Sequence, residues 1–241
     1  MTALQNTGPS ASRFDMVIVG DGYTASQTGL LRQHAQAKWN EIAATAPWNK
    51  YRQLINVWLV NVRSNESGMD NDPSPGINRD TALDMRFFCE GTERLLCLNE
   101  SKAKAYAAQA PGVDAIVAVG NTTKYGGAGY PSLASDSGGN ALSGRIAIHE
   151  LGHSVGGLAD EYDTPGTTYR GGEPREPNVT AYPRGAKWAF YLGRNTPTAA
   201  SSGPTRAGAT RWNGPSAAQK AAPPAPWQAG AGARRGSRRR R

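Results

Sequence analysis

Residues 143–158 read SGRIAIHELGHSVGGL, and this stretch decides what the rest of the fold has to support. Four of its apolar side chains recur at helical spacing: Ile146, Ile148, Leu151 and Val155. This spacing predicts a helix. Gly156 and Gly157 follow the last apolar residue and are well placed to end that helix.

His149, Glu150 and His153 form the pattern H-E-x-x-H on the predicted helix. Residues four apart lie one turn apart on the same helix face, so both imidazoles can point at one zinc ion, about 2 Å from each nitrogen. Glu150 is then angled toward a water that the metal activates, for which it can act as general base. Two histidines also fall four apart on ordinary helices. However, the chain has only three histidines, and the third, His34, is expected to be a surface or core residue.

A catalytic zinc ion needs a third protein ligand besides the two histidines. In metzincins this ligand stands ten residues after the first histidine, where this chain has Ala159, which cannot bind. Asp160 comes next, and the glycine pair at 156–157 lets the chain turn back toward the ion. We therefore expect Asp160 to be the third ligand, with Glu161 as the alternative. Both carboxylates could instead bond to their own backbone or to nearby arginines.

Apolar segments in the first half of the chain indicate an α/β fold. Residues 15–20 (DMVIVG) and 54–62 (LINVWLVNV) are predicted strands, with a long helix over residues 25–46 between them. This order is typical of parallel strands joined by a right-handed crossover. Residues 114–119 (DAIVAV) predict a third strand.

The segments between these elements are predicted as a helix and two loops. Asn99 is a plausible N-cap for a helix over residues 100–109. Residues 64–80 and 121–140 are rich in glycine, proline and polar residues, which favours surface loops.

The turn after the first strand offers an alternative function. Residues 20–25 (GDGYTA) fit the dinucleotide-binding pattern G-x-G-x-x-A, directly after a strand and before a helix. Asp21, between Gly20 and Gly22, would place a negative charge beside the pyrophosphate of such a ligand. A tight strand-to-helix turn is therefore the preferred interpretation, and dinucleotide binding is the alternative.

The formal net charge of +8 is unevenly distributed along the chain. Residues 194–241 hold nine arginines, one lysine and no acid, whereas the other 193 residues hold 17 basic and 19 acidic side chains. The tail lacks Ile, Leu, Val, Met, Phe and Tyr, so we expect it to be disordered. Its end, RRGSRRRR at 234–241, favours only non-specific binding of nucleic acid through phosphates, as a second alternative function.

The sequence also bears on export, membrane insertion and redox state. No stretch reaches 18 apolar residues, so we expect no membrane span. Residues 1–13 lack the features of an export signal, so we expect none there. Cys89 and Cys97 enclose seven residues, a spacing that permits a disulfide without demanding one.

The longer stretch HELGHSVGGLADEY, at 149–162, resembles the M64 family of zinc metallopeptidases, which is named for an immunoglobulin A peptidase. Further blocks resemble the family in the same order: VIVGDGYTA (17–25), NVWLVNVRSNESGMD (56–70), DTALD (80–84), NTTKYGGAGY (121–130) and PNVT (177–180). The resemblance covers residues 14–193, which are taken as the catalytic domain, ahead of the tail at 194–241.

The resemblance implies a metzincin-like α/β fold with a mixed sheet and hydrolysis of peptide bonds in a protein or peptide substrate. It implies Zn²⁺ bound by His149 and His153, Glu150 as the base, and Asp160 at the acidic position of the family. Family members are typically exported, which would suit a disulfide between the two cysteines. The loop at 121–130 would form the edge of the cleft, where the backbone of Tyr125, Gly126 and Gly127 could pair with an extended substrate.

Two departures from the family concern the C-terminal part. Metzincin-like folds carry a methionine turn beneath the metal, and this chain has no methionine after Met85. Family members also continue past the block at Lys187-Trp188, whereas 33 of the last 48 residues here are Ala, Gly, Pro or Arg. We expect a frameshift near Arg194 in a GC-rich gene, with a natural basic tail as the alternative. A frameshift would remove the lower half of the cleft and reduce activity.

Overall fold

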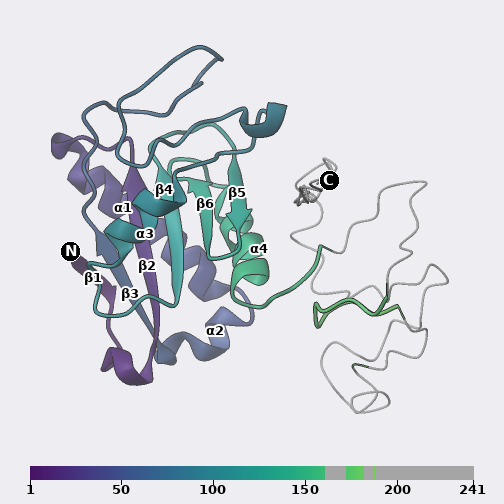
Figure 1. Cartoon of the computed structure of the whole chain (residues 1–241). Helices are drawn as coiled ribbons and strands as arrows, with labels where there is room; N and C mark the ends of the chain where they lie inside the picture. Colours follow the sequence, from purple (N-terminus) through teal and green to yellow (C-terminus); the bar gives the residue numbers. More distant parts are fainter. Residues whose placement is uncertain (161–171, 182–186, 188–241) are drawn as a thin grey trace, which may run out of the picture. The chain divides into compact units, whose positions relative to one another are not determined.

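A six-stranded mixed sheet lies at the centre of the described chain, in the strand order β1-β3-β2-β4-β6-β5 (Figure 1). The computed structural model describes residues 1–160, 172–181 and 187. The strands are β1 (Thr2–Gln5), β2 (Phe14–Asp21), β3 (Ile55–Val60), β4 (Ala115–Gly120), β5 (Gly127–Tyr130) and β6 (Leu133–Ser137). The four inner strands are parallel, and β1 and β5 pair antiparallel at the two edges. This confirms the predicted α/β fold with a mixed sheet.

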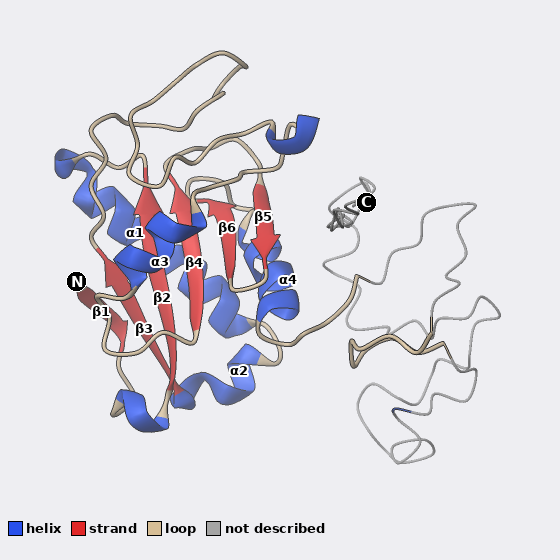
Figure 2. Cartoon of the chain, in the orientation of Figure 1, coloured by secondary structure: helices blue, strands red, loops and turns tan. Residues whose placement is uncertain are grey.

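Helices cover both faces of the sheet (Figure 2). They are α1 (Thr28–Ala44), α2 (Trp48–Tyr51), α3 (Glu100–Ala107) and α4 (Gly144–Ser154). Helices α1 and α4 share one hydrophobic core with the sheet, and α3 shares a second core with the other face. Asn99 caps α3 as predicted, because its Oδ1 accepts a hydrogen bond from the Lys102 N–H at 3.2 Å.

Strand β2 is the first of the predicted strands, and its surroundings explain why its apolar run is continuous and not alternating. Met16 and Ile18 belong to the core beneath α1 and α4, whereas Val17 and Val19 belong to the core on the α3 side. Successive side chains of a strand point to opposite faces, so a strand covered on both faces needs apolar residues throughout. Strands β2 and β3 are parallel and joined through α1, as the sequence predicts.

The prediction of a loop over residues 121–140 is wrong, because this stretch contains the hairpin of β5 and β6. Its glycines, serines and aspartate have low intrinsic strand propensity, and only tertiary partners stabilise the strands. The hydroxyl of Ser135 donates to Leu96 O at 2.6 Å, and that of Ser137 donates to Gly126 O at 3.2 Å. Buried polar residues that bond to neighbouring loops therefore take the place of the apolar residues expected in a strand.

The turn after β2 is occupied by the chain itself. The Asp21 carboxylate is fully buried and accepts hydrogen bonds from the N–H groups of Leu83 and Met85, both at 2.9 Å. Gly22 has a positive φ of 71°, and a Cβ there would collide with the carbonyl oxygen of Gly68. The loop at 64–85 thus packs against the turn at Asp21 and Gly22, and dinucleotide binding is not favoured.

The chain divides into two units. The first comprises Met1–Ala159 with Glu176–Asn178, and the second comprises Asp160–Arg175 with Val179–Arg241. The elements named above all belong to the first unit. The predicted disordered tail at 194–241 lies outside the described residues, so its disorder stays a prediction.

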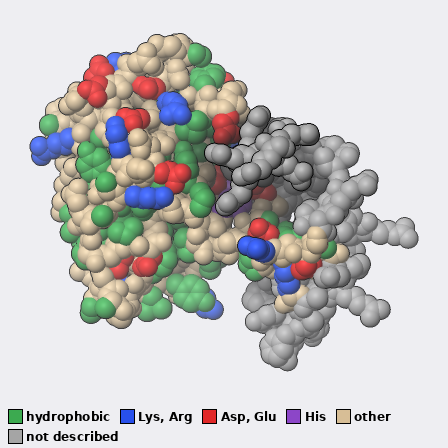
Figure 3. Space-filling view, in the orientation of Figure 1, with side chains coloured by type: hydrophobic (Ala, Val, Ile, Leu, Met, Phe, Trp, Pro, Cys, Tyr) green, Lys and Arg blue, Asp and Glu red, His purple; other side chains and the backbone are tan. Residues whose placement is uncertain are grey.

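Charges of both signs are interspersed on the described surface seen in Figure 3. This mixture agrees with the nearly balanced charge of residues 1–193. Within the described residues, none of the helices has the length and apolar composition needed to cross a membrane.

A buried carboxylate lies on β6, on the face covered by α1. Asp136 is fully buried, and neither of its oxygens has a hydrogen-bond partner among the described residues. Lys38 Nζ stands 4.0 Å away and donates instead to Asn140 O at 2.7 Å. Burial raises the pKa of Asp136 to about 7, although the charge of Lys38 acts in the opposite direction and Glu41 adds to the rise.

We expect Asp136 to lower the free energy of unfolding as the pH rises from about 4 to about 7. In this window the carboxyl is neutral in the folded chain and charged in the unfolded chain, because its folded-state pKa is the higher of the two. Asp136→Asn should remove this loss, which amounts to a few kcal/mol at most. Chemical denaturation of both proteins at about pH 4.5 and about pH 7.5 measures the difference. A stability gap between them that does not change with pH would contradict the expectation.

Candidate metal centre

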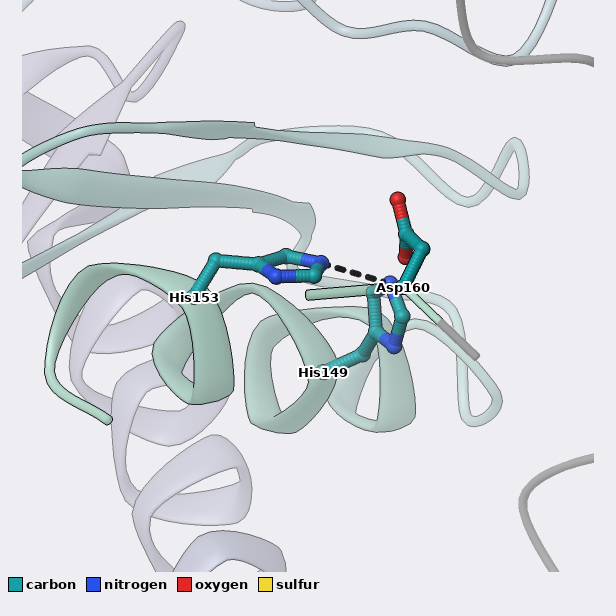
Figure 4. A group of neighbouring side chains, drawn as sticks. All are labelled: His149, His153 and Asp160. Atoms are coloured by element: carbon teal, nitrogen blue, oxygen red, sulfur yellow. Dashed lines mark hydrogen bonds between the residues drawn. The ribbon is translucent and has the colours of Figure 1, made fainter. Parts of the chain in front are cut away.

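Helix α4 presents the predicted ligands on its outer face. Ile146, Ala147 and Leu151 are buried on the opposite face, against the sheet and α1. His149 is exposed and His153 is half-buried. Residues four apart share a helix face, so the two imidazoles emerge next to each other (Figure 4).

The chain reverses direction directly after α4, which ends at Ser154. Gly157 has a positive φ of 59° and donates to His153 O, while the Leu158 N–H donates to Gly152 O. This reversal brings the Leu158 carbonyl oxygen within 2.5 Å of Nδ1 of His153. Because a carbonyl oxygen can only accept, Nδ1 carries the proton, and Nε2 is the nitrogen with a lone pair, which faces Nε2 of His149 and could bind a metal.

The ligand atoms of His149, His153 and Asp160 form a group that fits a metal ion. The two Nε2 atoms lie 3.1 Å apart, along the dashed line in Figure 4. Two nitrogens bound to a tetrahedral zinc ion would lie about 3.3 Å apart, so the imidazoles need little movement to bind one. An oxygen of Asp160 completes the group, in which all ligand atoms lie within 4.8 Å of one another. Two imidazoles and one carboxylate are a donor set that zinc accepts while keeping a fourth position open.

The other sequence-derived candidates are not in this group. Glu161 lies outside the described residues, so its role as the alternative ligand stays a prediction. His34 lies in α1, where its Nδ1 stands 2.7 Å from the Tyr23 hydroxyl. Partial burial lowers the pKa of His34, and the nearby charge of Lys38 lowers it further.

Glu150 lies against the edge strand β5. A methyl group added to Gly129 would overlap the Glu150 carboxylate, so the strand approaches this carboxylate only because residue 129 has no side chain. Glu150 is half-buried and follows His149 by one residue. The general-base candidate is thus confined between the ligand-bearing helix and the edge of the sheet.

The outer edge of β5 is hydrogen-bonded to a neighbouring loop at the beginning of the strand, and no such bond is found further along within the described residues. The Gly127 N–H donates to Arg94 O at 3.1 Å, and the Leu96 N–H donates to Gly127 O at 3.4 Å. The backbone groups of alternate residues point to the same side of a strand, so those of Gly129 also point away from β6. Among the residues that the structure describes, none bonds the backbone of Gly129 across this outer edge. Within the described part of the chain, the outward N–H and C=O of Gly129, beside Glu150, thus have no backbone partner.

The residues predicted to contact substrate precede this open position. Gly126 and Gly127 are buried, and Tyr125 is half-buried. Their role in substrate binding stays a prediction. Sequence reasoning missed Gly129, because a stretch predicted as a loop has no strand register from which to place it.

The loop that covers Gly127 is closed by a disulfide between Cys89 and Cys97, with an S–S distance of 2.01 Å.

A second residue missed by sequence reasoning lies where the chain leaves α4. The side-chain amide of Asn178 bonds to both backbone groups of Ala159, the residue before Asp160. Only the block PNVT at 177–180 marks this residue in the sequence, and that block says nothing of its contacts.

Comparison with models of known protein families identifies the family of this chain. The model of the family described as IgA Peptidase M64 matches residues 2–207. The chain belongs to this family. Among curated proteins, none matches the chain. Membership of the M64 family supports a peptidase, and with it protein or peptide substrates.

We expect Gly129→Ala to reduce peptide hydrolysis by this M64 chain about 100-fold, because the new methyl group displaces the Glu150 carboxylate. Hydrolysis of an unstructured protein substrate measures the loss. Gly29→Ala in α1 is the matched control, since a Cβ at Gly29 meets nothing within 4 Å. Wild-type rates in Gly129→Ala would show that the edge strand does not confine Glu150.

Proposed function

We propose that this chain is a zinc-dependent endopeptidase with a metzincin-like catalytic domain over residues 14–193. The observation that carries the proposal is the pair of Nε2 atoms of His149 and His153, 3.1 Å apart and grouped with an oxygen of Asp160. A mixed sheet with an antiparallel edge strand beside the ligand-bearing helix supports the same assignment. Glu150 adds the general base that the reaction requires.

His149 and His153 would hold the ion through Nε2, and Asp160 through a carboxylate oxygen. The bond between His153 and Leu158 O keeps the histidine in the tautomer that can bind. When bound, zinc supplies Lewis acidity, which lowers the pKa of a water molecule and polarises the scissile carbonyl. Three protein ligands would leave the ion open to that water.

Glu150 moves the proton in this mechanism. Its carboxylate takes a proton from the water as the water oxygen attacks the carbonyl carbon of the substrate. It then gives this proton to the nitrogen of the leaving amine as the C–N bond breaks. The narrow space between α4 and Gly129 keeps the carboxylate close to the point of attack.

An extended peptide would add to the outer edge of β5 at Gly129. The N–H and C=O of this residue, which point away from β6, can pair with the backbone of a substrate strand, whatever the side chains of that strand are. Such pairing selects for extended, unfolded segments of protein chains. The loop that bonds to Gly127 limits the pairing at the beginning of the strand.

The disulfide between Cys89 and Cys97 supports action in an oxidising compartment, such as the exterior of the cell.

Non-specific binding of nucleic acid by the arginine-rich end concerns residues outside the described part and stays a prediction. The frameshift near Arg194 likewise stays a prediction.

Zinc content and peptide hydrolysis test the proposal together. The purified wild-type chain should hold one zinc ion, and His149→Ala should lose it because one of three protein ligands is gone. Glu150→Gln should keep the zinc and lose activity by about 100- to 10,000-fold, because the base but no ligand is removed. Metal analysis by mass spectrometry and a fluorogenic peptide assay measure the two effects.

His34→Ala is the matched control, since it removes the one histidine outside the proposed centre. This variant should keep its zinc. Zinc retained by His149→Ala, or a wild-type chain that stays zinc-free after folding in the presence of zinc, would overturn the proposal.

A further inference from the structure

Asn178 holds the chain at the point where it leaves the candidate metal centre. Its Oδ1 accepts a hydrogen bond from the Ala159 N–H, and its Nδ2 donates to the Ala159 carbonyl, both at 2.8 Å. Both residues belong to the first unit. No other described residue bonds the backbone of Ala159. The amide therefore satisfies both polar groups of this residue at once.

These two bonds fix two consecutive peptide planes, because each peptide bond is rigid and planar. The N–H of Ala159 shares a plane with the carbonyl of Leu158, which accepts the bond from Nδ1 of His153 at 2.5 Å. The carbonyl of Ala159 shares a plane with the N and Cα of Asp160. Asn178 thus restrains the acceptor that orients one ligand and the backbone from which the other ligand extends.

The side chains of the turn add little to this restraint. Gly156 and Gly157 are exposed, and glycine gives the backbone the widest choice of conformations. Leu158 is 38% exposed, and Val155 is 40% exposed, so neither side chain anchors the turn in the core. Backbone bonds from Gly157 and Leu158 to α4 hold the turn as far as Leu158, and the Asn178 amide adds the two bonds that hold Ala159, the residue before Asp160.

We propose that Asn178 is a positioning residue of the metal centre, which holds His153 and Asp160 in the geometry that one ion requires. The inference rests on the proposed zinc site. The task needs an amide, because one donor and one acceptor must face the two backbone groups of a single residue. A carboxylate would lack the donor, and an apolar side chain would lack both.

The affinity for zinc and the spectrum of the cobalt-substituted chain test this role. Asn178→Ala should weaken zinc binding about 10- to 100-fold, as is typical when a group that supports a metal ligand is removed. Competition with a chromophoric chelator measures the affinity. The visible absorption bands of bound Co²⁺ should also change, because these bands report the geometry of the ligands around the ion. Loss of a residue with a merely structural role would leave the bands unchanged.

Asn178→Leu keeps the branched shape of asparagine, with two methyl groups in place of the amide oxygen and nitrogen, and lacks both bonds, so it provides a second variant should Asn178→Ala fail to fold. Both variants should lose affinity. Asn121→Ala is the matched control, since it removes an amide that bonds to the backbone of Gly22 at 2.8 Å, away from the proposed ligands. Its zinc affinity should stay within about twofold of wild type.

The outcomes separate this inference from the proposed function. If the wild-type chain binds zinc, and folded Asn178→Ala or Asn178→Leu binds it as tightly and with the same cobalt spectrum, Asn178 does not position the ligands. The zinc site would then stand without it. If the wild-type chain binds no zinc, the proposed function itself fails.

Discussion

The hydrogen bond between Nδ1 of His153 and the carbonyl of Leu158 is the interaction on which the candidate centre depends. It forms only because the chain reverses at the glycine pair after α4, with Gly157 in the left-handed conformation. The bond sets the tautomer of the histidine, and the same reversal brings Asp160 toward the two imidazoles. One local turn therefore prepares a ligand and supplies the next one.

The sheet determines what lies opposite these ligands. Helix α4 follows β6 and packs on the hairpin of β5 and β6, so the outer face of the helix stands beside the edge of the sheet. Gly129 allows close approach of that edge to Glu150, and none of the described residues bonds its outward backbone groups. The candidate general base and the strand position beside it thus come from one hairpin and the helix that follows it. This arrangement suits the cleavage of extended chains.

Local patterns predicted much of this structure. The continuous apolar runs of β2, β3 and β4 are strong signals because both faces of the sheet are covered. His149 and His153 could be paired because helical spacing alone places them on one face. The hairpin at 127–137 could not be predicted, since Ser135 and Ser137 are buried by bonds to loops that are distant in sequence. The contact of Asn178 with Ala159 is missed for the same reason, because it joins residues 19 positions apart through a side chain with no periodic signal.

X-ray absorption at the zinc edge of the zinc-loaded chain tests the central claim most directly. We predict a first shell of nitrogen and oxygen atoms at about 2.0–2.2 Å, with outer-shell scattering from two imidazole rings. The rings correspond to His149 and His153, and the oxygen to Asp160 and water. A spectrum without imidazole scattering, or one with a sulfur shell at about 2.3 Å, would contradict the account.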